Sequence, residues 1–156
     1  MTVETTVPPP PARAGLPRRL AAMFYDSLLL LALLMIVTAL FLLTTGGEAI
    51  DPRTQPVLEF IYRLVLLLLI VGFFGVSWTR SGQTLGMATW RLRVEREDGR
   101  RLTWVDTLRR LGWALVSLLP AGLGFAWVLV DPERRAWHDR LSRTRVVVVP
   151  KAAGRR

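Results

Sequence analysis

The sequence predicts an all-α membrane protein with two transmembrane helices, a third apolar segment broken by proline and glycine, and a small cytoplasmic β-hairpin or sheet. Three long apolar blocks carry this prediction: 20–43, 57–78 and 111–130. The β element is predicted because apolar and charged residues alternate at 90–95, which is the period of a half-buried strand.

Residues 20–43 form the first predicted transmembrane helix. This helix would be about 36 Å long, enough to cross a hydrocarbon core of about 30 Å with some tilt. No convincing cleavage site follows it, so we expect it to stay in the membrane as a signal anchor. Asp26 lies inside this block, and Arg19 lies seven positions earlier on nearly the same helix face. A carboxylate at membrane depth is costly unless it is paired, hydrated or protonated, so Asp26 is a candidate site residue.

Residues 57–78 form the second predicted transmembrane helix, and the third apolar block, 111–130, has two interpretations. The third block carries no charge, but Pro120, Gly122 and Gly124 interrupt it at its centre. It either enters and leaves on the cytoplasmic side as a re-entrant segment, or crosses once as a kinked span. We favour the re-entrant form, because one full crossing would place the Arg-rich C-terminal end outside, against the positive-inside rule.

The polar segments are expected to form a small sheet. Residues 90–95 are predicted to be a strand, the Asp98-Gly99 pair a hairpin turn, and 101–105 a returning strand. Asp106 or Thr107 is then expected to cap the helix that enters the third apolar block. The valine run within 145–149 is predicted to pair with one of these strands, placing Leu92, Val94 and Val147 on one buried face.

Composition divides the chain into three parts and indicates a membrane protein. Residues 1–17 are predicted to be a disordered Pro-rich tail, 18–150 the membrane domain, and 151–156 a basic C-terminal tail. The formal charge of +9 follows the flanks of the apolar blocks, which predicts a multi-pass cell-membrane protein with a cytoplasmic N-terminus and no nucleic-acid partner. Tryptophans near the block ends are expected to form an interfacial belt.

The sequence offers no pattern for soluble-type enzyme chemistry or for a cofactor. Cysteine is absent, so disulfides and thiolate metal sites are excluded. The single histidine, His138, cannot supply a metal site by itself. There is no P-loop and no pairing of a nucleophile with a base. We therefore expect no enzyme activity, no cofactor and no metal.

Several motifs in order resemble those of the RDD family, named for one arginine and two aspartates. The opening signature contains Arg19 and Asp26, and the polar segment contains a Thr-Leu-Gly core at 84–86. Arg110 precedes Leu118-Leu119-Pro120, and the closing motif runs from His138-Asp139-Arg140-Leu141 to Thr144. Met87 departs from the pattern, because the family usually has a basic residue after Thr-Leu-Gly. The resemblance implies a shared polar site of Arg19, Asp26 and Asp139, supported by Thr84, Gly86, Arg110 and Thr144.

The residues leave the pairing within this site open. Asp26 lies about 10 Å below Arg19 along a helix, too far for comfortable direct pairing. Arg19 is expected to meet lipid phosphate or Asp139, and Asp26 to meet Arg110, Thr84 or Gln83.

The resemblance implies a membrane protein more firmly than an activity. Transport of unidentified small ligands has been proposed for the family, and cation/proton antiport is associated with some members. The alternative is a structural or accessory membrane protein. A third possibility is that the Arg-rich cytoplasmic face binds lipid head groups or a partner protein. The expected partners are the bilayer, further copies of the chain and, in the transport reading, a monovalent cation or proton.

Overall fold

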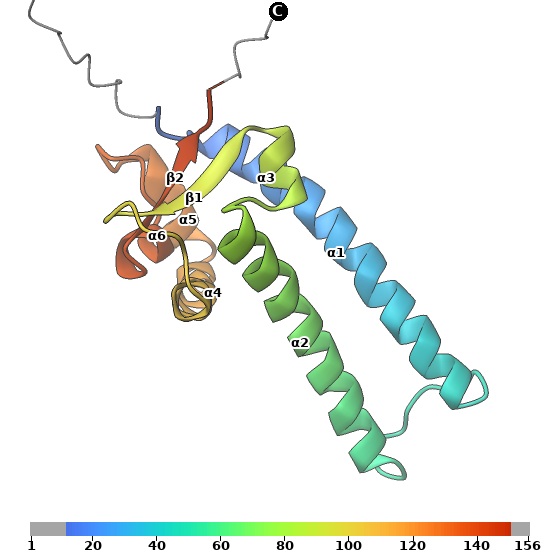
Figure 1. The fold of residues 1–156 in the computed structure, drawn as a ribbon. Helices are drawn as coiled ribbons and strands as arrows, with labels where there is room; N and C mark the ends of the chain where they lie inside the picture. Colours follow the sequence, from blue (N-terminus) through green and yellow to red (C-terminus); the bar gives the residue numbers. More distant parts are fainter. Residues whose placement is uncertain (1–11, 151–156) are drawn as a thin grey trace, which may run out of the picture.

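Two long helices form an antiparallel hairpin that dominates the computed structural model, which describes residues 12–150 (Figure 1). They are α1 (Leu16–Thr44) and α2 (Pro56–Arg80), and each is long and apolar enough to cross a membrane. A proline stands in the first turn of each helix, where its missing N–H and fixed φ are compatible with helix initiation. Many apolar side chains on both helices point outward, as expected of surfaces that face lipid.

The shorter elements gather at the end of the hairpin where α1 begins and α2 ends (Figure 1). They are α3 (Leu85–Thr89), β1 (Leu92–Arg96), α4 (Trp104–Leu118), α5 (Leu123–Ala126), the 3-10 helix η1 (Trp127–Leu129), α6 (Trp137–Leu141) and β2 (Thr144–Val148). Their common core contains Leu92, Val94, Met87 and Trp78. The fold class is confirmed: a mostly helical membrane protein with two candidate spans, a bent third segment and a two-stranded sheet.

The sheet is built from β1 and β2, so of the two partner strands predicted for the valine run, 90–95 and 101–105, the structure supplies the first. The predicted returning strand 101–105 is wrong, because Thr103 caps α4 and the helix begins at Trp104. Val147 is opposite Arg93, whereas Val146 and Val148 are opposite Val94 and Leu92. Because side chains alternate between faces, the valines that share the face of Leu92 and Val94 are Val146 and Val148, and Val147 lies on the other face.

Helix α4 begins with a capping box, which corrects the predicted cap. The Thr103 side chain accepts a hydrogen bond from the Asp106 backbone N–H, and the Asp106 carboxylate accepts one from the Thr103 backbone N–H. Thr103 is therefore the cap and Asp106 its partner, because their spacing satisfies two free helix N–H groups at once. Thr107, the other predicted cap, lies buried inside the first turns.

The third apolar segment bends sharply between α4 and the α5–η1 pair. The two parts meet at 108°, and the turn contains Ala121 and Gly122, both with positive φ. After this bend the chain returns through α6 to β2, which pairs with the strand that follows α2. Both flanks of the third apolar segment therefore lie at the same end of the α1–α2 hairpin.

The boundary of the predicted N-terminal tail lies earlier than residue 17. Leu16 and Pro17 are in α1, Arg13 forms an isolated bridge with Val147, and Ala14 is fully buried against the core. Residues 12–17 are therefore part of the folded body, because the sheet offers their backbone hydrogen-bond partners such as the Val146 carbonyl. The rest of the predicted tail, and the predicted basic tail 151–156, lie outside the described residues.

Candidate functional site: a buried arginine–aspartate network

Asp139 is the centre of a buried ion network. It lies in the first turn of α6 and is fully buried. The Arg19 Nη1 donates to its Oδ2 at 2.5 Å, and the Arg110 Nη1 lies 2.6 Å from its Oδ1. The backbone N–H of Ala136 donates to Oδ2 as well, at 3.1 Å. The network joins α1, α4 and α6, three elements far apart in the sequence.

Arg19 fixes the start of α1 to the loop before α6. Its Nη2 donates to the Arg134 carbonyl at 2.9 Å and its Nε to the Ala14 carbonyl at 3.2 Å. With Asp139 these contacts occupy all three nitrogens of the guanidinium. Of the two predicted partners of Arg19, the structure therefore supplies Asp139.

Arg110 is the second arginine of the network and pairs with the other oxygen of Asp139. Its Nη1 donates to the Thr144 hydroxyl at 2.5 Å, and its guanidinium carbon lies 5.2 Å from the centre of the Trp78 ring. Thr144 in turn shares a hydrogen bond with Ser142 at 2.8 Å. Arg110 and Thr144, both supporting residues by resemblance, are thus in direct contact with the second aspartate of the motif or with each other.

Charge sets the protonation states around Asp139. Burial alone would raise the pKa of the Asp139 carboxyl, but the positive charges of Arg110 and Arg19 outweigh burial and hold that pKa well below its usual range. Burial, together with the Arg110 charge, lowers the pKa of the neighbouring His138 to about 3. At neutral pH the network therefore contains an ionised Asp139 between two arginines, beside a neutral imidazole.

Asp26 forms a second, separate cluster with the α2–α3 connection. Thr84 donates its hydroxyl to Oδ2, and the Gly86 backbone N–H donates to Oδ1 at 2.8 Å. The predicted partners Arg110 and Gln83 are wrong: Arg110 is paired with Asp139, and Gln83 donates to the Leu92 carbonyl. Asp26 is buried, and its described hydrogen-bond partners are neutral groups.

The glycine of the Thr-Leu-Gly core is required by close approach of the backbone. A Cβ on Gly86 would meet the Ala22 carbonyl and lie 2.9 Å from the Asp26 carboxylate. A side chain at this position would therefore displace α3 from α1 and break the amide contact to Asp26. Met87, where the family usually has a basic residue, is buried in the core beside it.

The Arg19–Asp139–Arg110 network and the Asp26 cluster both contribute residues to the wall of one pocket between α1, α2 and α4. Its volume is about 610 Å³, and it is lined by residues of both clusters, among them Arg19, Asp26, Thr84, Arg110 and His138. Sequence reasoning missed Trp78, which is also in the wall. Its position at the end of an apolar block predicts a tryptophan at the membrane interface, yet only 8% of the residue is exposed.

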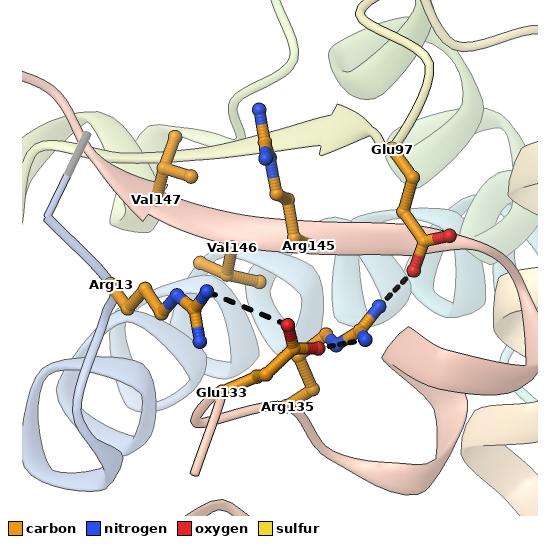
Figure 2. Close-up of a pocket in the computed structure, with 7 residues that line it drawn as sticks. All are labelled: Arg13, Glu97, Glu133, Arg135, Arg145, Val146 and Val147. Carbon is orange, nitrogen blue, oxygen red and sulfur yellow. Dashed lines mark hydrogen bonds and ion pairs between the residues drawn. The ribbon is translucent and has the colours of Figure 1, made fainter. Parts of the chain in front are cut away.

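A smaller pocket of about 170 Å³ lies beside the sheet and is held by surface ion pairs (Figure 2). Figure 2 shows a chain of charges in which Arg13 faces Glu133 at 3.6 Å, and Arg135 pairs with both Glu133 and Glu97. These ion pairs link the segment before α1, the loop before α6 and the residue after β1. Exposed pairs of this kind contribute little each, so we assign this surface to local ordering.

The geometry defines a membrane protein with two apolar spanning helices and a buried Arg–Asp–Arg network at one end of them. The RDD family model matches residues 13–143, which is most of the described chain, and the protein belongs to the RDD family. Comparison with curated proteins and with solved structures found no match.

Proposed function

We propose that this RDD protein exchanges protons for monovalent cations across the membrane, with Asp26 as the group that takes up and releases the proton. The observation that carries the proposal is the environment of Asp26: a buried carboxylate in a spanning helix, on the wall of the pocket, held by a hydroxyl and an amide rather than by a cation. Because no arginine of residues 12–150 pairs with Asp26, its protonation leaves no buried positive charge there without a partner.

Two spans and a re-entrant segment make a thin pathway, so the proposed exchanger is a homo-oligomer in the cell membrane. The proposed orientation places the N-terminus and the sheet in the cytoplasm, following the basic flanks of the apolar blocks. The bend of 108° and the return of the chain to β1 support the re-entrant form of the third segment.

The test is cation-driven proton flux in everted vesicles, measured with Asp26→Asn. Asparagine can keep both contacts, because its oxygen accepts from Gly86 and its amide donates to the Thr84 hydroxyl. The variant should accumulate as wild type does and lose flux with sodium, lithium and potassium. The matched control is Asp51→Asn in the exposed α1–α2 connection, which should keep flux. An Asp26→Asn protein with wild-type flux would refute the exchange.

The second candidate is a structural or accessory role, which the Arg19–Asp139–Arg110 network favours. In this role the network is a clamp that fixes α1 to α4 and α6. Asp139→Asn would leave two buried arginines without a counter-charge, at a cost of about 3–5 kcal/mol, and should lower the protein level in the membrane. Loss of the protein in Asp139→Asn together with unchanged flux in Asp26→Asn would favour this candidate over the exchanger.

A further inference from the structure

The pocket between α1, α2 and α4 opens on the apolar surface of the protein. Several of its wall residues, including Leu67, Leu115 and Leu118, are more than half exposed. These residues belong to the helices whose outer surfaces are apolar enough to face lipid. The volume of about 610 Å³ is typical of small-molecule sites. The pocket is therefore accessible to molecules dissolved in the bilayer.

The pocket is polar at one end and apolar at the other. Arg19 and Trp78 mark the polar end, near the start of α1 and the end of α2, where a bilayer has its head groups. Leu67 lies at the apolar end, eleven residues from Trp78 along α2, which is about 16 Å of helix. That length matches one leaflet, half of a hydrocarbon core of about 30 Å. The pocket thus has the polarity and the length of a lipid in one leaflet.

The polar end contains nitrogen atoms that lack a partner within residues 12–150. The Trp78 Nε1 and the His138 Nδ1 are buried with no hydrogen bond in the described chain. The hydrogen bond and ion pair of Arg110 both involve Nη1, which leaves its other N–H groups for a ligand. Arg110 packs on Trp78, so these two donors are adjacent. The oxygens of Asp26, which also faces the pocket, are already held by Thr84 and Gly86.

From this arrangement we infer that the pocket is a binding site for an anionic phospholipid of the surrounding bilayer, with its phosphate at Arg110 and Trp78 and one acyl chain along α2 towards Leu67. The Arg19–Asp139–Arg110 network contains two positive charges and one negative charge, so its net positive charge attracts the phosphate. An acyl chain gains little by leaving the bilayer for an apolar groove, because lipid tails are as apolar as leucine. The head group therefore decides the selectivity, and an anionic lipid is preferred over a zwitterionic one.

Spin-labelled lipids test this site on the full chain in phosphatidylcholine vesicles. Electron paramagnetic resonance gives the motionally restricted fraction of labelled phosphatidylglycerol relative to labelled phosphatidylcholine. Wild type should restrict the anionic lipid more. Trp78→Phe keeps a ring under Arg110 but loses the N–H, so the relative association constant for phosphatidylglycerol should fall about tenfold, as for loss of one hydrogen bond to a charged group.

Gly112→Leu blocks the pocket without touching the ion network. Gly112 lines the pocket, and a Cβ there meets nothing within 4 Å, so leucine fits in open space. The expected result is loss of the phosphatidylglycerol preference. Gly72→Leu is the matched control, because a Cβ on Gly72 also meets nothing within 4 Å and the residue is outside the pocket wall. It should retain the preference.

Three results would overturn the site. They are equal restriction of the two lipids by wild type, an unchanged preference in Gly112→Leu, or an unchanged preference in Trp78→Phe. If a helix of a second copy fills the pocket instead, Gly112→Leu should reduce the oligomer mass in light scattering and leave lipid binding unchanged. Because the readout is lipid restriction and not flux, the outcome is independent of the proposed exchange.

Discussion

At the scale of single residues, the two aspartates of the family motif occupy opposite environments. Asp139 lies between two arginines and stays ionised, whereas the described partners of Asp26 are a hydroxyl and a backbone amide. Replacing Asp139 should mainly affect folding, since its loss leaves buried charges uncompensated. Replacing Asp26 should mainly affect function, since its neutral partners tolerate an amide.

His138 should make the stability of the protein depend on pH. Its native pKa of about 3 lies below the ordinary value of 6.5, because of burial first and the Arg110 charge second. As pH falls below about 6.5 the unfolded chain binds a proton that the native state refuses, so stability falls until the pH reaches the native pKa. The slope should approach about 1.4 kcal/mol per pH unit.

The measurement is the melting temperature of the detergent-solubilised protein between pH 7 and pH 4. His138→Phe keeps an aromatic ring against Phe125 and should reduce the acid-side decline. Asp139 acts in a different window: its depressed pKa gives stability above the ordinary value of 3.8, which is lost only at lower pH. An equal decline in wild type and His138→Phe would show that other groups cause it.

At the scale of elements, α2 and α4 approach closely where Gly75 faces Trp104. A Cβ on Gly75 would overlap the Trp104 ring, while a Cβ on Gly72, one turn earlier, meets nothing within 4 Å. The absence of a side chain at Gly75 therefore lets the first turn of α4 lie against the end of α2. This contact helps to hold the pocket wall, because Trp78 and Arg110 lie on the same two helices.

Substituting these two glycines by alanine should have opposite effects on thermal stability. Gly75→Ala forces the Trp104 ring to move and should cost about 1–3 kcal/mol. Gly72→Ala has room and should be neutral or stabilise by about 0.5–1 kcal/mol, because alanine loses less backbone entropy in a helix. The free energy of unfolding in a denaturant series measures both. A destabilised Gly72→Ala beside an unaffected Gly75→Ala would contradict the observed packing.

At the scale of the whole molecule, the sheet brings both flanks of the third apolar segment to one end of the hairpin. Strand β1 follows α2 and β2 follows α6, and the two pair directly, with Glu95 opposite Arg145. A single crossing between them would place these strands on opposite sides of the membrane. Antiparallel pairing therefore favours the proposed re-entrant topology.

Single cysteines should reveal that topology, because the chain contains none of its own. Cysteines replacing Asp98 after β1 and Arg143 before β2 should both react with an impermeant maleimide from the cytoplasmic side. A cysteine replacing Glu48 in the α1–α2 connection should react only from the opposite side. Labelling of Arg143→Cys from the Glu48 side would show that the third segment crosses completely.

The elements whose cause is local follow from the sequence alone. Long apolar blocks predict α1 and α2, since only a spanning helix hides such a run and satisfies its backbone in lipid. The alternation at 90–95 and the valine run predict two strands that pair. The motifs Arg19, Asp26, Thr84-Leu85-Gly86 and Asp139 identify the family and most of the polar site. Residue spacing is enough for these features because periodicity and composition act within one segment.

The pairing of the buried charges depends on the tertiary structure. Arg110 pairs with Asp139 and Thr84 binds Asp26, although the sequence left Arg110, Thr84 and Gln83 open as partners of Asp26. The predicted returning strand 101–105 is instead a short loop and the start of α4, because Thr103 and Asp106 cap that helix and β1 pairs with β2. Trp78 is buried because α4 lies beside α2 and puts Arg110 over its ring. These outcomes depend on contacts between segments far apart in the chain, where burial and charge pairing outweigh local preference.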